Sequence, residues 1–113
     1  MMNLFSLLFF SCSTKTIQLA PTPVGAIPSG KVRIKVSRTN SEAGSLCTHD
    51  IYDKSRVIGT LGVGGTLYWE RDADKVLRIR GKQKSGACGH FYSQRMQPLD
   101  GESYEFVAAI GTP

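Results

Sequence analysis

The stretch Lys31–Val36, KVRIKV, decides the fold class of this chain. Its apolar residues Val32, Ile34 and Val36 alternate with cationic ones, and a strict period of two is typical of a β-strand with one buried face. The same alternation returns near the C-terminus, in Ser103–Ile110. The stretch therefore predicts a sheet that packs through one face and carries positive charge on the other.

Short segments of the same kind fill the chain between these two strands, and clusters of Gly, Asp and Ser separate them. Such clusters are typical of turns, and no long segment shows helical periodicity. We therefore predict an all-β fold, a small β-sandwich of about seven short strands, Ig-like or prealbumin-like. The strands are predicted at Lys31–Val36, Leu46–Tyr52, Arg56–Leu61, Thr66–Arg71, Val76–Arg80, Phe91–Leu99 and Ser103–Ile110.

Length and composition are those of a single small globular domain. The chain has 113 residues, of which 41% are hydrophobic and 20% are charged. Its net charge of +5 favours anionic surroundings. A charge of this size is also sufficient simply to keep a small domain soluble, so both interpretations stay open at this point.

The segment before the strands predicts an export signal and a tether. Met1–Phe10, MMNLFSLLFF, is uncharged and nearly all apolar, yet much shorter than the about 20 apolar residues that span a bilayer. That length suits the apolar part of a signal peptide. Three prolines in Ser13–Gly30 exclude a helix, so we expect a flexible linker there. The predicted organisation is a signal segment (1–12), a Pro/Ser/Thr linker (13–30) and a β-sandwich domain (31–113).

Leu8–Cys12, LFFSC, resembles the lipobox of bacterial lipoproteins, in which the cysteine receives diacylglycerol. Phe9 and Phe10 are bulkier than the residues usual before the cleavage site. The resemblance implies lipidation of Cys12 and a membrane anchor made of acyl chains such as palmitate. Ser13, directly after that cysteine, implies sorting to the outer membrane with the domain facing the periplasm. The alternative is an apolar first strand with Cys12 as a buried thiol.

The other two cysteines admit two competing interpretations. If Cys12 carries the lipid, two cysteines remain, Cys47 and Cys88. Two thiols in an exported protein meet oxidising conditions, which predicts a disulfide between them. Each is followed two residues later by a histidine, His49 or His90, and residues i and i+2 of a strand share a face. Two thiolates and two imidazoles are also a ligand set for Zn²⁺. Because a disulfide consumes the thiolates, the two exclude each other; the disulfide is preferred, and zinc or unpaired structural thiols are the alternatives.

Outward-facing cations form the candidate partner site. If the first and fifth predicted strands are neighbours, their cations merge into one basic face suited to lipid phosphates, lipopolysaccharide or peptidoglycan carboxylates. The alternative is a solvated face whose cations protect the sheet edges. Nucleic acid is not expected, because it calls for exposed aromatic rings among the charges, and these two strands supply none. The candidate residues are Arg33, Lys35, Arg78, Arg80, Lys82 and Lys84.

No enzymatic activity is expected. Ser45, His49 and Asp50 have the residue types of a nucleophilic triad, but a strand would place His49 and Asp50 on opposite faces. Three aromatic residues are candidates either for a sugar-stacking platform or for the core: Tyr68, Trp69 and Tyr92.

Most of the chain, about Lys31–Ile110, resembles small bacterial lipoproteins with a PEGA-like or prealbumin-like sandwich. The resemblance rests on Asp50–Leu61, DIYDKSRVIGTL, where a turn leads into a Val/Ile-Gly-x-Leu strand, and on Val76–Arg80, VLRIR. A closing Leu-x-x-Gly-x-x-Tyr-x-Phe pattern, with its glycine one residue early, is matched by Leu99, Gly101, Tyr104 and Phe106. It implies a non-catalytic module and supplies no functional residue.

The sequence therefore predicts a non-enzymatic, lipid-anchored periplasmic domain. Its expected partners are the membrane and another envelope protein or an anionic envelope polymer, which the domain would bind or scaffold. The alternative is a metal-binding or redox-responsive envelope protein that uses Cys47, His49, Cys88 and His90. No cofactor is expected apart from the zinc of that alternative.

Overall fold

The computed structural model describes residues 16–39, 47–86 and 88–109. The signal segment with Cys12 lies outside the described residues, as do Ser45 and Ile110. The described residues form an all-β sandwich, which confirms the predicted fold class. No helix within them has the length and apolar character needed to cross a bilayer. The strands are β1 (Ile17–Gln18), β2 (Lys31–Arg38), β3 (Thr48–Asp53), β4 (Arg56–Leu61), β5 (Thr66–Asp72), β6 (Ile79–Ser85), β7 (Phe91–Tyr92) and β8 (Ser103–Ala108).

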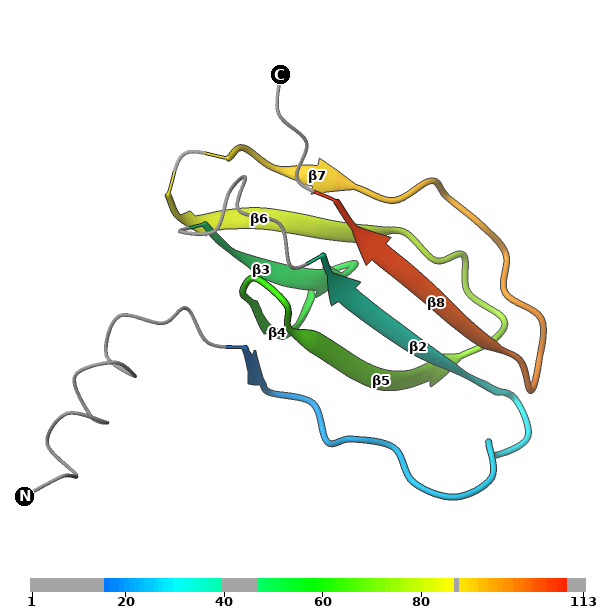
Figure 1. Cartoon of the computed structure of the whole chain (residues 1–113). Helices are drawn as coiled ribbons and strands as arrows, with labels where there is room; N and C mark the ends of the chain where they lie inside the picture. Colours follow the sequence, from blue (N-terminus) through cyan, green and yellow to red (C-terminus); the bar gives the residue numbers. More distant parts are fainter. Residues whose placement is uncertain (1–15, 40–46, 87, 110–113) are drawn as a thin grey trace, which may run out of the picture.

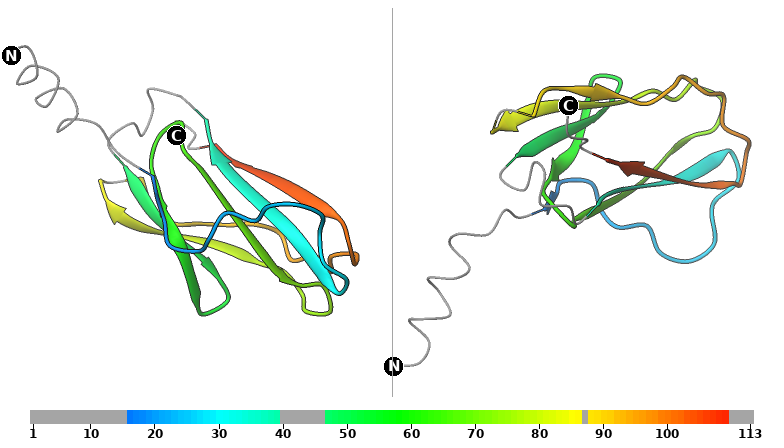
Figure 2. Two further views of the ribbon diagram at one scale, coloured as in Figure 1. Left: turned by 90° about the horizontal axis from the view of Figure 1, so that it is seen from below. Right: turned by 45° about the horizontal axis from the view of Figure 1, so that its top comes forward.

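The strands form two facing sheets (Figure 1). Sheet A has five strands in the order β1-β4-β3-β6-β7, and sheet B has three in the order β5-β2-β8. All paired strands are antiparallel except β2 and β8, which run parallel. In the right-hand view of Figure 2, β6 and β7 lie in one layer and β8 lies in the other. The edge strands β7 and β8 therefore lie on the same side of the sandwich.

The alternation that predicted β2 corresponds to burial in the core. Val32, Ile34 and Val36 are at most 1% exposed, whereas the cations between them are half-buried. They pack in one cluster with Trp69 of β5, which is fully buried and therefore belongs to the core. Burying an aliphatic side chain of this size contributes about 1.5–3 kcal/mol to folding.

A buried ion pair joins the two sheets. Asp53, the last residue of β3, accepts hydrogen bonds from Trp69 Nε1 and from Arg71 Nε of β5, both at 2.8 Å. The Arg71 guanidinium also donates to three backbone carbonyls at and just after the end of β5. The Asp53 and Arg71 side chains are each 7% exposed. A buried charge pair of this kind requires such additional hydrogen bonds, because they compensate the loss of hydration.

Five of the predicted strands match β2, β3, β4, β5 and β8 to within two residues at either end. The prediction of a strand at Val76–Arg80 is displaced, because β6 begins at its fourth residue and continues beyond it. An inward position of that extension is Gly81, where a Cβ would lie 2.2 Å from the Phe91 ring, so the apolar residue comes from the neighbouring strand. The strand predicted at Phe91–Leu99 is too long: β7 covers two residues, and an isolated bridge follows at Met96.

Part of the segment predicted as a linker contributes to the fold. β1 pairs with β4, and Ala20, directly after it, is buried. The Gln18 side-chain amide donates to the Tyr68 carbonyl of β5 at 2.6 Å. The sheets therefore begin at Ile17, before the predicted domain start at Lys31. A strand of two residues has too few positions for an alternation to be visible in the sequence.

Candidate functional site: a basic face and an apolar groove

The predicted disulfide is present. Cys47, directly before β3, is bonded to Cys88 in the loop between β6 and β7, with a Cα–Cα distance of 6.1 Å and a sequence separation of 41. Gly86 lies against this bridge with a φ of 85°, and a Cβ there would approach the Cys47 sulfur to 2.6 Å. Only glycine suits that position, because it tolerates both the left-handed backbone and the close approach.

The two histidines near the cysteines do not share a site. His49 is fully buried; its Nε2 lies 2.7 Å from the Gly89 carbonyl, and its ring meets that of Phe91 edge-on at 4.9 Å. His90 is exposed, and its Nδ1 accepts the backbone N–H of Gln83 at 2.8 Å. In the described part of the chain, no three His, Cys, Asp or Glu side chains are arranged to hold a metal. The four residues of the metal alternative therefore do not converge, and two of them are consumed by the disulfide.

Burial governs the protonation of His49. Because Nε2 donates to the Gly89 carbonyl, Nδ1 is the unprotonated nitrogen, and it has no hydrogen-bond partner among the described residues. Burial lowers the pKa of the His49 imidazole below its ordinary value of 6.5, and the hydrogen bond to Gly89 opposes that shift. The buried imidazole is therefore uncharged at neutral pH.

Two of the three residues considered as a nucleophilic triad, His49 and Asp50, do not lie on the same face of the sheet. Asp50 lies on the outer face of β3, opposite to His49, and accepts a hydrogen bond from Thr60 at 2.8 Å. Ser45 lies outside the described residues. His49 and Asp50 thus occupy opposite faces of one strand, as the alternation of side chains predicts.

The six cations predicted as one basic face lie on two different sheets. β2 lies between β5 and β8 in sheet B, whereas β6 lies between β3 and β7 in sheet A. The prediction of a single face is therefore wrong, because the two basic strands are not neighbours. On sheet B are Arg33 and Lys35. On or directly before β6 in sheet A are Arg78, Arg80, Lys82 and Lys84.

The cations on the outer face of sheet B are paired with carboxylates of the flanking strands. These pairs are Lys31–Asp72 at 2.6 Å, Arg33–Glu70 at 3.0 Å through Nε, and Lys35–Glu105 at 2.7 Å. The hydrogen-bonded Glu105 carboxylate raises the pKa of Lys35, and Lys31 lowers the pKa of Asp72. The charges of sheet B therefore neutralise one another across its strands.

Lys35 of sheet B also lies near a ring, 5.9 Å from the centre of Tyr68, but it is paired with Glu105. Two cations of sheet A, Arg78 and Arg80, stack on tyrosine rings without such a pair among the described residues. The Arg80 guanidinium lies 4.4 Å from the centre of the Tyr52 ring, and the Arg78 guanidinium lies 4.7 Å from that of Tyr92, both within the range of a cation–π contact. Arg80 and Tyr92 are cross-strand neighbours, so ring and cation alternate across β3, β6 and β7. Neither arginine forms an ion pair with a described carboxylate. Arg80 Nε is buried and has no hydrogen-bond partner among the described residues. We call Tyr52, Arg78, Arg80, Lys82 and Tyr92 the basic–aromatic face.

Two hollows flank Arg80 and Tyr92 on this face. The larger, of about 360 Å³, is lined by Lys54, Val76, Arg78, Arg80, Tyr92 and Arg95. The smaller, of about 170 Å³, is lined by Arg80, Lys82, His90 and Tyr92. Among the described residues no carboxylate lines either hollow, and a concave surface with one sign of charge concentrates counter-ions. The arrangement is suited to binding anionic groups.

Tyr52 was not predicted as part of this face, and Tyr92 was considered only for a sugar-stacking platform. Both rings come from strands other than the two basic ones, Tyr52 from β3 and Tyr92 from β7. The observation used against nucleic acid, that the two basic strands contain no exposed ring, holds for the strands but not for the folded face, where the exposed Tyr92 ring lies against Arg78. The considered sugar platform is not formed, since Trp69 is buried and Tyr68 belongs to sheet B. The outward phase of Tyr52, next to the buried Ile51, was a signal that was available in the sequence.

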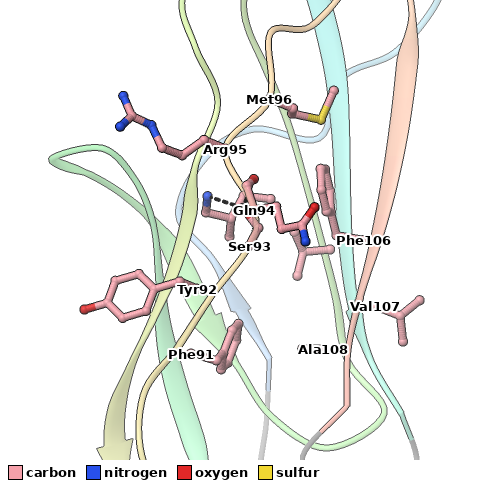
Figure 3. A pocket seen from close by; sticks show the side chains of 11 residues that line it. Phe91, Tyr92, Ser93, Gln94, Arg95, Met96, Phe106, Val107 and Ala108 are labelled. Atoms are coloured by element: carbon pink, nitrogen blue, oxygen red, sulfur yellow. Dashed lines mark hydrogen bonds between the residues drawn. The ribbon is translucent and has the colours of Figure 1, made fainter.

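An apolar groove of about 370 Å³ opens between β8 and the segment 91–96, at the edges of the two sheets. Its floor reaches the core, because two buried core residues, Val36 and Ile79, line it. Figure 3 shows Phe91 and Phe106 directed into the space between the two segments, with Met96 at one end. Within the part of the chain that the structure describes, no acidic residue lines this groove.

Comparisons of the chain with protein-family models, with curated proteins and with solved structures found no match. The basic–aromatic face and the groove beside it are the surface features of the described residues that are suited to a ligand.

Proposed function

We propose that this chain is a non-catalytic, lipid-anchored domain of the bacterial cell envelope that binds a phosphate-bearing envelope component through its basic–aromatic face. The observation that carries the proposal is the alternation of Tyr52, Arg80, Tyr92 and Arg78 without a paired carboxylate among the described residues. A guanidinium stacked on a ring is held in a fixed plane, and its N–H edge stays open to the bidentate hydrogen bonds that phosphate oxygens accept.

The proposed location rests on the N-terminal sequence and on the disulfide. The apolar segment ending at Cys12 resembles a lipoprotein signal, and Ser13 favours the outer membrane. A disulfide between Cys47 and Cys88 suits an oxidising compartment such as the periplasm.

Metabolic labelling with palmitate tests this location. We expect label in the wild-type chain in the outer-membrane fraction and none in the Cys12→Ala variant. Equal labelling of both chains, or an unprocessed chain in the cytosol with reduced thiols, would contradict the envelope proposal.

The phosphate proposal is tested by the salt concentration that elutes the full, disulfide-bonded chain from phosphocellulose. The variant Arg78→Gln/Arg80→Gln removes two charges from the basic–aromatic face, and the matched variant Arg33→Gln/Lys35→Gln removes two charges from sheet B. We expect the first to elute at clearly lower salt and the second close to wild type, because only the first pair is available to a ligand. Equal shifts would show that net charge alone causes retention and would overturn the proposal.

Two further columns identify the chemistry of the partner. We expect weaker retention on carboxymethyl cellulose than on phosphocellulose, because a phosphate accepts more hydrogen bonds from a guanidinium pair and carries more charge. Retention on immobilised oligothymidylate that exceeds both would assign the tyrosines to base stacking and the face to single-stranded nucleic acid. That result would replace the envelope proposal.

A further inference from the structure

The apolar groove and the larger basic hollow adjoin each other. Both are lined by Tyr92 and Arg95, which belong to the segment 91–96 that separates them. Figure 3 shows the side chains of these two residues on one side of the segment and Phe106 on the other. An apolar site and a cationic site thus share one wall.

The two sites differ in the chemistry that they accept. Within the groove, Phe91, Met96 and Phe106 are half-buried residues packed against the core, so an apolar ligand there would extend the core toward the surface. The groove's volume of about 370 Å³ is at the small end of ligand sites, which suits one extended chain rather than two. Of the six described residues that line the hollow, four are cations: Lys54, Arg78, Arg80 and Arg95.

We infer that the groove holds one acyl chain of a phosphate-bearing lipid, whose phosphate lies against Arg78 and Arg95. This inference rests on the proposed binding of phosphate by the basic–aromatic face and names its ligand class. A single-chain amphiphile with an anionic head matches both charge and polarity across the shared wall. The exposed Arg95 is long enough to direct its guanidinium to a head group at the rim, as snorkelling side chains do.

The test titrates the full chain with inorganic phosphate and with hexyl, octyl and decyl phosphate, each kept below its micelle concentration. Affinity is read from calorimetry, and occupancy of the groove is read from the NMR signal of the Met96 methyl group. We expect affinity to increase by about fourfold for each added methylene until the groove is full, because each buried methylene contributes similarly. The Met96 signal should move with the alkyl phosphates and not with phosphate.

Two variants fill the groove from different sides. Ala108→Phe adds a ring from β8, and Gln94→Trp adds one from the exposed side of the segment 91–96. The matched control is Ser103→Phe, which adds the same ring to an exposed position of β8 that does not line the groove. Both filling variants should bring decyl phosphate down to the affinity of phosphate, whereas the control should not. Gln94→Trp keeps the test valid if Ala108→Phe does not fold.

The outcomes separate the inference from the proposed function. Equal affinity for phosphate and decyl phosphate, or chain-length dependence that survives both filling variants, overturns the groove assignment and leaves phosphate binding standing. If the wild-type chain binds neither inorganic phosphate nor any alkyl phosphate, both the groove assignment and the proposed phosphate binding are overturned. Decyl maltoside, which lacks a charge, should bind at least tenfold more weakly than decyl phosphate; equal binding would show that the arginines play no part.

Discussion

The two outer faces of the sandwich both carry cations but place them in different surroundings. On sheet B, Arg33 and Lys35 are each paired with a carboxylate of a neighbouring strand. On sheet A, Arg78 and Arg80 stack on tyrosine rings and have no ion-pair partner in the described part of the chain. The difference shows that a net charge of +5 says little about a binding surface until the neighbours of each cation are known.

The largest expected effect comes from a substitution that disrupts the buried ion pair between the two sheets. Asp53→Ala removes the acceptor of both Trp69 Nε1 and Arg71 Nε and leaves a buried, unpaired guanidinium. We expect a loss of about 3–5 kcal/mol in the free energy of unfolding, measured by urea denaturation. Asp72→Asn, which removes an exposed pair with Lys31, is the control and should cost less than about 1 kcal/mol. Equal losses would show that the buried pair has no special role.

Removal of the disulfide weakens one face more than the other. Cys47→Ala/Cys88→Ala frees a loop closed over a separation of 41 residues, and we expect a loss of about 2–5 kcal/mol in stability. The bridge ties β3 to the loop that leads into β7. Amide hydrogen exchange should therefore accelerate first in β7 and last in β2. Uniform acceleration in both sheets would contradict this difference.

The buried His49 makes the interior beneath sheet A sensitive to pH. Its pKa in the folded state lies below the value of 6.5 that it has when exposed, so the unfolded state binds more protons as the pH falls below 6.5. The contribution of His49 is fully present above pH 6.5 and is lost as the pH decreases toward the folded pKa, with a slope of at most about 1.4 kcal/mol per pH unit.

Chemical denaturation between pH 7 and pH 5 measures this slope. His49→Gln should flatten the slope, and the exposed His90→Gln should leave it unchanged. A slope that persists in His49→Gln would assign the pH dependence to other groups.

The smallest expected effect is the coupling energy of an ion pair on sheet B. A double-mutant cycle with Arg33→Gln and Glu70→Gln should give a coupling energy of about 0.2–1 kcal/mol, because the pair is only partly buried. A coupling energy of zero would mean that the carboxylates of sheet B do not hold its cations, which would then be as available to a ligand as those of sheet A.

The sequence predicted the fold because the buried positions alternate within single strands. β2 was located to within two residues, since Val32, Ile34 and Val36 form its pattern within one strand. β6 was displaced because the apolar group over Gly81 is the ring of Phe91 from another strand. The sequence pattern within β6 contains no information about a side chain that a neighbouring strand supplies.

The candidate site was only partly predictable for a related reason. Arg78 and Arg80 were identified from the sequence, and so was the pairing of Cys47 with Cys88. The topology decides which strands lie beside β6. Its neighbours β3 and β7 place tyrosines next to Arg78 and Arg80, whereas Arg33 lies in the other sheet. The groove depends on the separation of β7 and β8, which no local pattern encodes.

The most direct test observes the arginine side chains themselves. NMR signals of the Nε–H groups are followed while inorganic phosphate is added to the wild-type chain. The exposed Arg78, which has no ion-pair partner in the described part of the chain, should shift progressively with phosphate, whereas Arg33, whose Nε is bonded to Glu70, should stay in place. Equal shifts at both arginines, or a shift at Arg33 alone, would contradict the claim that only the sheet A cations are available to a ligand.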